Sequence, residues 1–480
     1  MPKKSLDSLL LFFLVIAKIE IDSLADNVLP DRIADVQRLI AGWRWHTFFQ
    51  RLDHPQTDPV TMLLWVSAFG LLGLYVLVSL WKGSQGWAFG FKLITLYAII
   101  ALLVVGKTGL LIALRHQSVP WSYSHDGGVI QTETTIEYFF SGKNPYVEDY
   151  VNTPMAQWGI NEYRTALYHY PYLPLMFVFS APFFALAHST IGWFDERMVY
   201  LPLFVLMLAL VPLMVRDKRE KLLAVMLIGL NPIMAEDVIF GVSDPFVLFW
   251  LVLAVWLLAK RRPQPLWASA ALGLACAAKP TAWFLVPFWL LYLLKDVWGA
   301  RLVPPVSRWG ALAKTALRRT WSLPVVALAL LLPYFLWNPF AMYDDVWRWS
   351  AGQGETGYQI WGWGASNLVL AFGWVADRFE YFPFIVPQII VGVPLLVWLF
   401  RRQLKENSLG VMLWGYAIFL FVFFYFSRFM QPNYLGFLGS VLALGYFLEI
   451  GDWRFNQSPI NQPPISKDES AYPPARVPLP

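Results

Sequence analysis

The sequence has little charge and almost no cysteine. Only 14% of its 480 residues are Asp, Glu, Lys or Arg, whereas soluble proteins carry about 25%. So few charged side chains cannot cover a soluble fold in which 57% of the residues are hydrophobic. The same hydrophobicity excludes an intrinsically disordered chain. The single cysteine, Cys276, excludes a disulfide framework and a cysteine-based metal site within one chain.

Long apolar runs take the place of the missing charge. A helix of about 20 apolar residues crosses a bilayer, and long continuous runs are unlike the short alternating strands of a transmembrane barrel. The runs lie at 61–80, 88–114, 198–215, 222–240, 245–259, 266–294, 322–337, 383–400, 409–427 and 432–449, with shorter ones at 8–19 and 173–187. Pro280 predicts a break into two short helices inside 266–294. The sequence therefore predicts an all-α, polytopic integral membrane protein of about 10–13 transmembrane helices.

Basic residues give this bundle an orientation. They gather in four short loops, at 216–221, 260–262, 295–319 and 401–405. Alternate crossing puts these loops on one side, which the positive-inside rule makes cytoplasmic. The net charge of +5 is thus a topology signal, and no nucleic-acid partner is expected. The opposite side, outside the plasma membrane, then receives two long loops, 116–172 and 338–382, provided that 173–187 does not cross fully or that it has an unrecognised partner span.

Composition divides the chain into three parts. Residues 1–60 are expected to form a short span or an interfacial segment, and 61–450 the transmembrane domain with both long outer loops. Residues 451–480 are rich in proline and polar side chains, which predicts a disordered tail.

The first outer loop, 116–172, contains a helix with a carboxylate at its start. Asp126 precedes Gly127 and Gly128, and the apolar spacing of 129–142 is helical until Gly142 ends it. Asp126 can act as a helix N-cap. It can also take a proton from a sugar hydroxyl, with the two glycines leaving room for a bulky substrate.

A divalent cation is the one possible cofactor that these residues suggest. Glu133 and Glu137 lie four residues apart on the expected helix, so they share a face. Together with His125 or His169 they could ligate a metal. The alternative is that both glutamates form a solvated helix face.

Further charged and aromatic residues are expected on the outer side. Asp244 begins an apolar run in GVSDPF, as a cap or as a functional carboxylate. Lys279 and Arg428 lie at outer ends of spans, against the positive-inside rule, and either snorkel or pair with a lipid phosphate. The rings of 338–382 fit an interfacial belt or sugar stacking: Tyr343, Trp347, Trp349, Tyr358, Trp361, Trp363, Trp374 and Tyr381.

These motifs, in this order, resemble the GT-C superfamily of glycosyltransferases. Members are multi-pass enzymes that use polyprenyl-phosphate-linked sugars, and family 87, the mannosyltransferases and the aminoarabinose-transferase-like groups are the most similar. The resemblance covers roughly residues 60–450. Four stretches carry it: Asp126 followed by SGKNPY up to Tyr146, YHYPYLP from Tyr168, GVSDPF with Asp244, and LGLACAAKP with Lys279.

The resemblance implies a function and a set of site residues. It implies an inverting glycosyltransferase with a GT-C-like bundle that moves a hexose or pentose from a polyprenyl-phosphate donor to a glycan, lipid or protein acceptor. Asp126 would be the general base and Asp244 would shape the site, while Lys279 and Arg428 would bind the donor phosphate. Substrate-binding roles would fall to His125, Glu133, Tyr146, Tyr168, His169 and Tyr170.

A membrane transporter or lipid flippase is the alternative. It would place charged residues or broken helices near the bilayer midplane, for which Lys107 and the pair Glu236-Asp237 are candidates. An enzyme would instead gather Asp126, Asp244 and Lys279 around one outer cavity. The spatial arrangement of these residues therefore distinguishes the two hypotheses.

Overall fold

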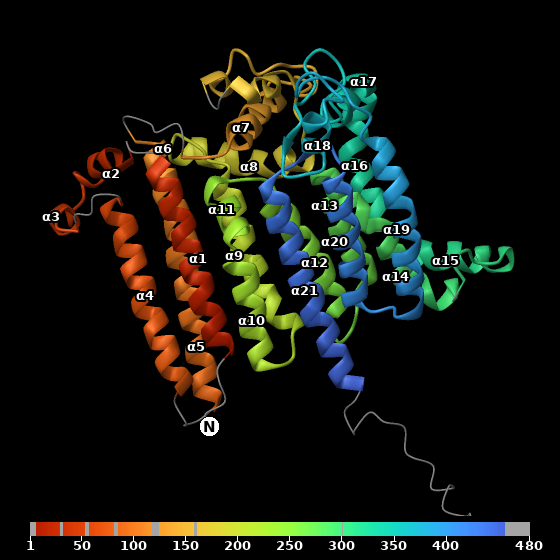
Figure 1. Ribbon diagram of the computed structural model, residues 1–480, viewed down its shortest axis with the longest axis horizontal. Coiled ribbons are helices and arrows are strands. Elements are labelled where there is room, and N and C mark those ends of the chain that lie inside the picture. The colour runs from red at the N-terminus through yellow and green to blue at the C-terminus, as the bar shows by residue number, and fades with distance from the viewer. Residues whose placement is uncertain are drawn as a thin grey trace, which may run out of the picture.

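The fold is an almost purely helical bundle (Figure 1). The computed structural model describes residues 6–28, 32–52, 57–80, 85–117, 124–157, 161–299 and 301–456. Within these ranges the only strands are β1 (Trp361–Gly362) and β2 (Phe429–Met430), which pair in parallel. Most of the expected disordered tail, from 457 onward, lies outside the described residues.

The N-terminal helices form one side of the bundle, coloured red and orange in Figure 1. Their bounds are α1 (Leu6–Val28), α2 (Arg32–Ile40), α3 (His46–Gln50), α4 (Pro59–Leu80), α5 (Gln85–Ile100) and α6 (Lys107–Arg115). A π-helical turn, Ala101–Gly106, joins α5 to α6 in one long span. Helix α1 continues beyond its apolar run because Lys18 is ion-paired inside the bundle with Asp22, at 2.5 Å, and with Glu236.

The middle of the chain supplies the core of the bundle. It comprises α8 (Leu175–Thr190), α9 (Arg197–Met214), α10 (Lys218–Gly229), α11 (Pro232–Phe240), α12 (Asp244–Ala259), α13 (Pro265–Ala278) and α14 (Val286–Trp298). The expected break at Pro280 is confirmed, since a 3₁₀ turn (Pro280–Leu285) separates α13 from α14. The run 222–240, expected as one span, is broken: α10 and α11 meet at 52°. Asn231 caps α11 and Pro232 follows it, so the backbone restarts there.

The C-terminal third closes the bundle and carries the second outer loop. Its helices are α15 (Trp309–Arg319), α16 (Ser322–Trp337), α17 (Pro339–Tyr343), α18 (Ser366–Ala371), α19 (Ile385–Lys405), α20 (Leu409–Tyr425) and α21 (Pro432–Asn456). A short 3₁₀ turn (Val306–Arg308) leads into α15, and a π-helical turn (Asp344–Arg348) follows α17.

Several helices are long and apolar enough to cross a membrane. By length and composition, four of the described helices qualify: α4, the span 86–115, α9 and α19. The number becomes six if the bent pairs α10–α11 and α15–α16 each count as one span. Helices α8, α12, α13 and α20 are apolar but have 10–17 residues. The all-α, polytopic membrane class is confirmed.

The two ends of the bundle differ. Figure 1 shows α7 (Gly127–Phe140), α17 and α18 at one end, whereas the connection between α9 and α10 and the projecting α15 lie toward the other. The long outer loops thus meet at one end, and basic loops lie at the opposite end. Helix α8 packs beside α7 at the loop-bearing end.

Candidate active site

Asp126 is held where a loop, α7 and α11 meet. Its carboxylate accepts a hydrogen bond from the Gly128 backbone N–H at 2.8 Å, so the predicted N-cap is present. Its own N–H donates to the Phe240 carbonyl, the last residue of α11, at 2.7 Å. Burial raises the pKa of the Asp126 carboxyl, which makes its ionised form a stronger base.

A buried arginine fastens this loop to α11. The fully buried Arg197 donates to the carbonyls of Ser124, at 2.7 Å, and Ile239, at 3.1 Å. Asp195 balances its charge through two hydrogen bonds of 2.8 Å. Gly241 has φ +79°, and a Cβ there would lie 2.5 Å from Val129. Glycine is therefore required for the close approach of α7.

A cavity of about 680 Å³ opens at this end of the bundle. Asp126, Lys279 and Arg428, which are far apart in sequence, all line it. Asp244 does not line the cavity itself but contacts Lys279. Its buried side chain pairs with the Lys279 ammonium at 2.8 Å and accepts a hydrogen bond from Asn433. The structure thus gathers the four predicted charged residues, with Asp244 positioning the lysine.

Lys279 is oriented from two sides. Its Nζ lies 3.2 Å from the Ser243 hydroxyl in addition to its contact with Asp244, and both residues belong to the start of α12. The Tyr434 ring lies 5.6 Å from the same ammonium. A lysine ammonium has three donors, so one remains for a ligand in the cavity.

Arg428 holds the second outer loop and also brings positive charge to the cavity. Its guanidinium donates to the backbone carbonyls of Tyr358, Arg378 (2.9 Å) and Glu380 (3.0 Å). Burial lowers the pKa of Arg428 to about 10. Among the described residues no carboxylate lies within ion-pair distance of it. Its charge is therefore solvated by carbonyl dipoles and is not cancelled.

The aromatic residues of the second outer loop divide into two groups. Trp347, Trp349, Tyr358 and Tyr381 line the cavity. Trp363 and Trp374 are each 63% exposed. An apolar part of the wall comes from the turn after α13, the start of α19 and the end of α20: Phe284, Phe384, Ile385, Phe423 and Phe424. The cavity therefore combines a charged end with an apolar wall.

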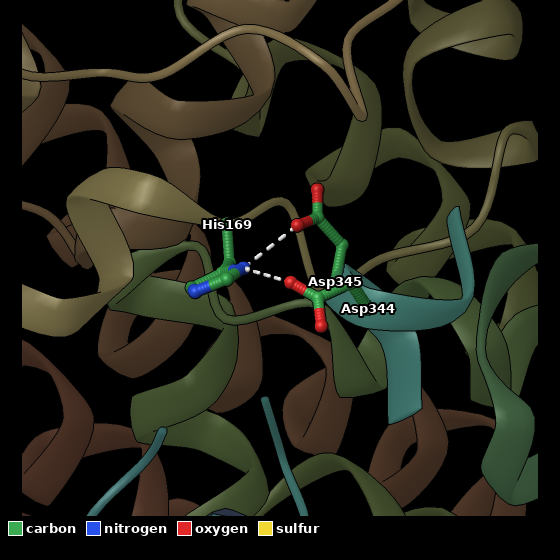
Figure 2. Close-up of side chains that lie close together, drawn as sticks. All are labelled: His169, Asp344 and Asp345. Atoms are coloured by element: carbon green, nitrogen blue, oxygen red, sulfur yellow. Dashed lines mark hydrogen bonds and ion pairs between the residues drawn. The ribbon is translucent and has the colours of Figure 1, made fainter. Parts of the chain in front are cut away.

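His169 joins the two outer loops (Figure 2). Its Nδ1 lies 2.8 Å from an Asp345 oxygen, and its Nε2 lies 2.7 Å from the Thr356 hydroxyl. The second Asp345 oxygen accepts a hydrogen bond from the Tyr170 N–H at 2.9 Å. Burial raises the pKa of the Asp345 carboxyl to about 6. The pair lies next to the cavity wall, because the imidazole ring centre is 5.7 Å from that of Trp349.

The expected metal-ligand set does not come together among the described residues. Glu133 receives two hydrogen bonds from Arg115, at 2.9 and 2.5 Å, and accepts another from the Glu196 N–H. His169 lies instead with Asp344 and Asp345, and one ligand atom from each falls within 4.8 Å of the others. These groups already bind one another, Thr356, Tyr170 and Arg348. Such contacts fit a hydrogen-bonded junction better than a cation site.

None of the six predicted substrate-binding residues lines the cavity, although some of them contact residues that do. Tyr146 is buried and donates to the Tyr172 carbonyl at 2.9 Å, and the fully buried Tyr170 packs against Tyr146. The His125 ring lies 2.9 Å from the Asp126 carbonyl, and burial lowers the pKa of this histidine to about 3. Tyr168 is 47% exposed.

Several residues in the cavity were not predicted as glycosyltransferase site residues, and Gln131, Tyr172 and Asp237 are among them. Gln131, one turn along α7 from Asp126, lines it and donates to the carbonyls of Ala166 and His169. Tyr172 and Asp237 line it as well. A helical projection places Gln131 on the inner face of α7, but no local pattern distinguishes the other two.

One family of known proteins matches this chain. Residues 137–295 match the family model for the N-terminal domain of alpha-(1->6)-mannopyranosyltransferases. The resemblance to GT-C mannosyltransferases is confirmed. The match spans about a third of the chain and includes Asp237, Asp244 and Lys279, while Asp126 lies just before it. No curated protein and no solved structure matches the chain.

The similarity and the fold agree on a coarse activity. Together they support a glycosyltransferase in a multi-pass membrane protein, with a sugar donor, a glycan acceptor and the bilayer as partners.

Proposed function

We propose that this protein transfers a sugar from a polyprenyl-phosphate donor to a glycan, lipid or protein acceptor at the outer face of the plasma membrane. The observation that carries the proposal is the cavity that presents Asp126, Lys279 and Arg428 beside a wall of phenylalanine side chains. A lipid-linked sugar phosphate has a complementary part for each: a polar ring for Asp126, an anion for the two cations and an apolar chain for the phenylalanine wall.

The two cations fit the phosphate of such a donor. Lys279 has a donor to spare, and Arg428 brings charge that no carboxylate among the described residues cancels by ion pairing. Charge-assisted contacts to phosphate are strong, and they gain strength as negative charge develops on a departing phosphate. The apolar wall provides a surface for the first isoprene units.

Asp126 is placed to act as the base in a single displacement. The acceptor hydroxyl oxygen forms a bond to the anomeric carbon while the bond from that carbon to the phosphate oxygen breaks. The hydroxyl proton passes to Asp126, and polyprenyl phosphate leaves carrying the electron pair. One displacement inverts the anomeric configuration.

The outer face follows from charge asymmetry. The connection between α9 and α10 and helix α15, which carry basic residues, lie toward the end of the bundle away from α7 and α17 (Figure 1), and such loops remain cytoplasmic. The cavity would then open toward the extracytoplasmic side.

Of the three charged residues that a transporter would use, two are bonded within the bundle, and the third, Asp237, lines the cavity. Glu236 and Lys18 form an ion pair within the bundle, and Lys107 donates to Thr61 at 2.9 Å. The functional carboxylates and Lys279 instead gather at the loop-bearing end, as the enzyme hypothesis requires. The arrangement favours group transfer.

A charge-removing variant tests the proposal. Membranes that contain equal amounts of wild type or Asp126→Asn are given radiolabelled polyprenyl-phosphate mannose, glucose or arabinose and a cell-envelope acceptor. Asparagine caps helices as well as aspartate does, so this variant should fold. Loss of the base should reduce transfer about 10²–10⁴-fold. Asp149→Asn, at an exposed carboxylate of the same loop, is the matched control. Full transfer by Asp126→Asn would exclude Asp126 as the base.

A further inference from the structure

Helix α11 carries two adjacent carboxylates with opposite surroundings. Glu236 faces α1, where the Lys18 ammonium pairs with it. Asp237 lines the cavity and is only 5% exposed. Its Oδ2 is buried and makes no hydrogen bond within the described part of the chain. A buried carboxylate oxygen without a hydrogen-bond partner reduces stability, so its presence beside the cavity points to a ligand that supplies the hydrogen bond.

The charges near Asp237 do not supply that partner. The groups close enough to act on it are Asp126, Asp244, Lys279 and Glu236. Three of these are acidic, and the lysine is already bonded to Asp244 and Ser243. Because Asp237 lines the cavity, its carboxylate can accept hydrogen bonds from hydroxyl groups of a ligand there. Sugar rings offer hydroxyls in adjacent pairs.

The backbone of α11 keeps Asp237 and the proposed base in fixed relation. The helix begins at the Asn231 cap and ends at Gly241, whose N–H bonds back to the Asp237 carbonyl. Phe240, which binds the Asp126 N–H, is one turn beyond Asp237. A ring held by Asp237 would therefore be presented at a constant position relative to Asp126.

We propose that Asp237 is a specificity-determining residue that accepts hydrogen bonds from hydroxyls of the donor sugar ring. The inference rests on the proposed function, since it assigns the ring of the donor whose phosphate meets Lys279. The donor ring is favoured over the acceptor because the sugar is bonded directly to that phosphate, and Asp237 and Lys279 line the same cavity.

The test compares donors that differ by one hydroxyl. Farnesyl-phosphate mannose and the forms that each lack one ring hydroxyl are given to purified wild type and to Asp237→Leu, and kcat/KM and Kd are measured. Wild type should discriminate against at least one deoxy donor by about 10- to 100-fold, the range for a hydrogen bond to a charged group. Asp237→Leu, which cannot accept a hydrogen bond, should lose that discrimination.

Two controls separate binding from folding. Asp237→Leu should keep or raise the Tm, because leucine has a similar shape and needs no partner. Glu236→Gln changes the neighbouring carboxylate; it should lower the Tm and leave discrimination among donors unchanged. If Asp237 had a merely structural role, Asp237→Leu would lower the Tm and leave discrimination among donors intact.

The outcomes distinguish this inference from the proposed function. If wild type transfers mannose and Asp237→Leu discriminates among the deoxy donors as wild type does, the role of Asp237 is refuted and the proposed function stands. If Asp237→Leu instead removes the acid limb of the pH profile, Asp237 is a base and not a hydroxyl acceptor. If wild type neither binds nor transfers any donor, both proposals fail.

Discussion

Gly128→Ala offers a sharp test of the geometry around Asp126. Gly128 is the second residue of α7, and its N–H binds the Asp126 carboxylate. A Cβ at this position would lie 2.6 Å from the Tyr172 hydroxyl and 2.9 Å from the Asp126 Oδ2. Ordinary contact begins at 3.4 Å, so the hydroxyl must move by about 0.8 Å and the carboxylate by about 0.5 Å.

Displacements of this size should affect rate more than stability. A reacting group misplaced by 1 Å can cost about 10²-fold in rate, so we expect kcat to fall about 10- to 100-fold. Overpacking costs about 1–3 kcal/mol. Replacing a helical glycine with alanine returns about 0.5–1 kcal/mol. The net loss of stability should therefore be small.

The assay measures kcat, KM and Tm for Gly128→Ala with a polyprenyl-phosphate donor. Gly109→Ala is the matched control, because Gly109 lies in helix α6 and a Cβ there would meet nothing within 4 Å. Tyr172→Phe removes the closest obstructing atom, so the double variant should recover part of the lost rate.

Two results would refute this reasoning. One is a kcat for Gly128→Ala within twofold of the wild-type value, which would mean that the carboxylate position does not matter. The other is strict additivity of Gly128→Ala and Tyr172→Phe, which would show that the two side chains do not collide.

Further predictions concern the charged groups of the site and the junction between the loops. Lys279→Gln should raise the KM for the donor about 10- to 100-fold, since it removes a charge-assisted contact to phosphate; an unchanged KM would exclude that contact. Asp126 should give kcat/KM an acid limb above the usual aspartate pKa of about 3.9, because burial raises the pKa of this carboxyl; a limb near pH 4 or lower would contradict this. The pKa of Asp345 is raised to about 6, so wild-type stability should fall as pH rises from about 4 to 6, and Asp345→Asn should lose this dependence in Tm measurements. If both proteins show the same slope, the Asp345 carboxyl does not have the raised pKa.

Local signals predicted the parts of the site that form locally. The Asp126 cap, the helix after it and the break at Pro280 all depend on residues within a few positions of one another. The run 222–240 was misjudged because its composition is predominantly apolar, although Asn231-Pro232 is a helix-start signal.

Long-range pairing could not be predicted from one sequence. His169 and Asp345 are 176 residues apart, and no periodicity relates them. The same holds for Glu133: its spacing from Glu137 suggested a ligand pair, but Arg115 and the Glu196 backbone bind it. Asp237 is adjacent to Glu236, and only the packing of α11 shows which of the two faces the cavity.

Arg428 holds the second outer loop through backbone carbonyls, so the side chains at these positions can vary without loss of the contacts. The guanidinium holds the carbonyls of Tyr358, Arg378 and Glu380, and every amino acid supplies the same carbonyl. This part of the anchorage is thus independent of side-chain identity, whereas the Asp345 junction depends on a side chain. Substitutions among the rings of this loop can therefore change the cavity wall while the three carbonyls stay bound to Arg428, so that a single arginine keeps the backbone constant beneath a variable surface.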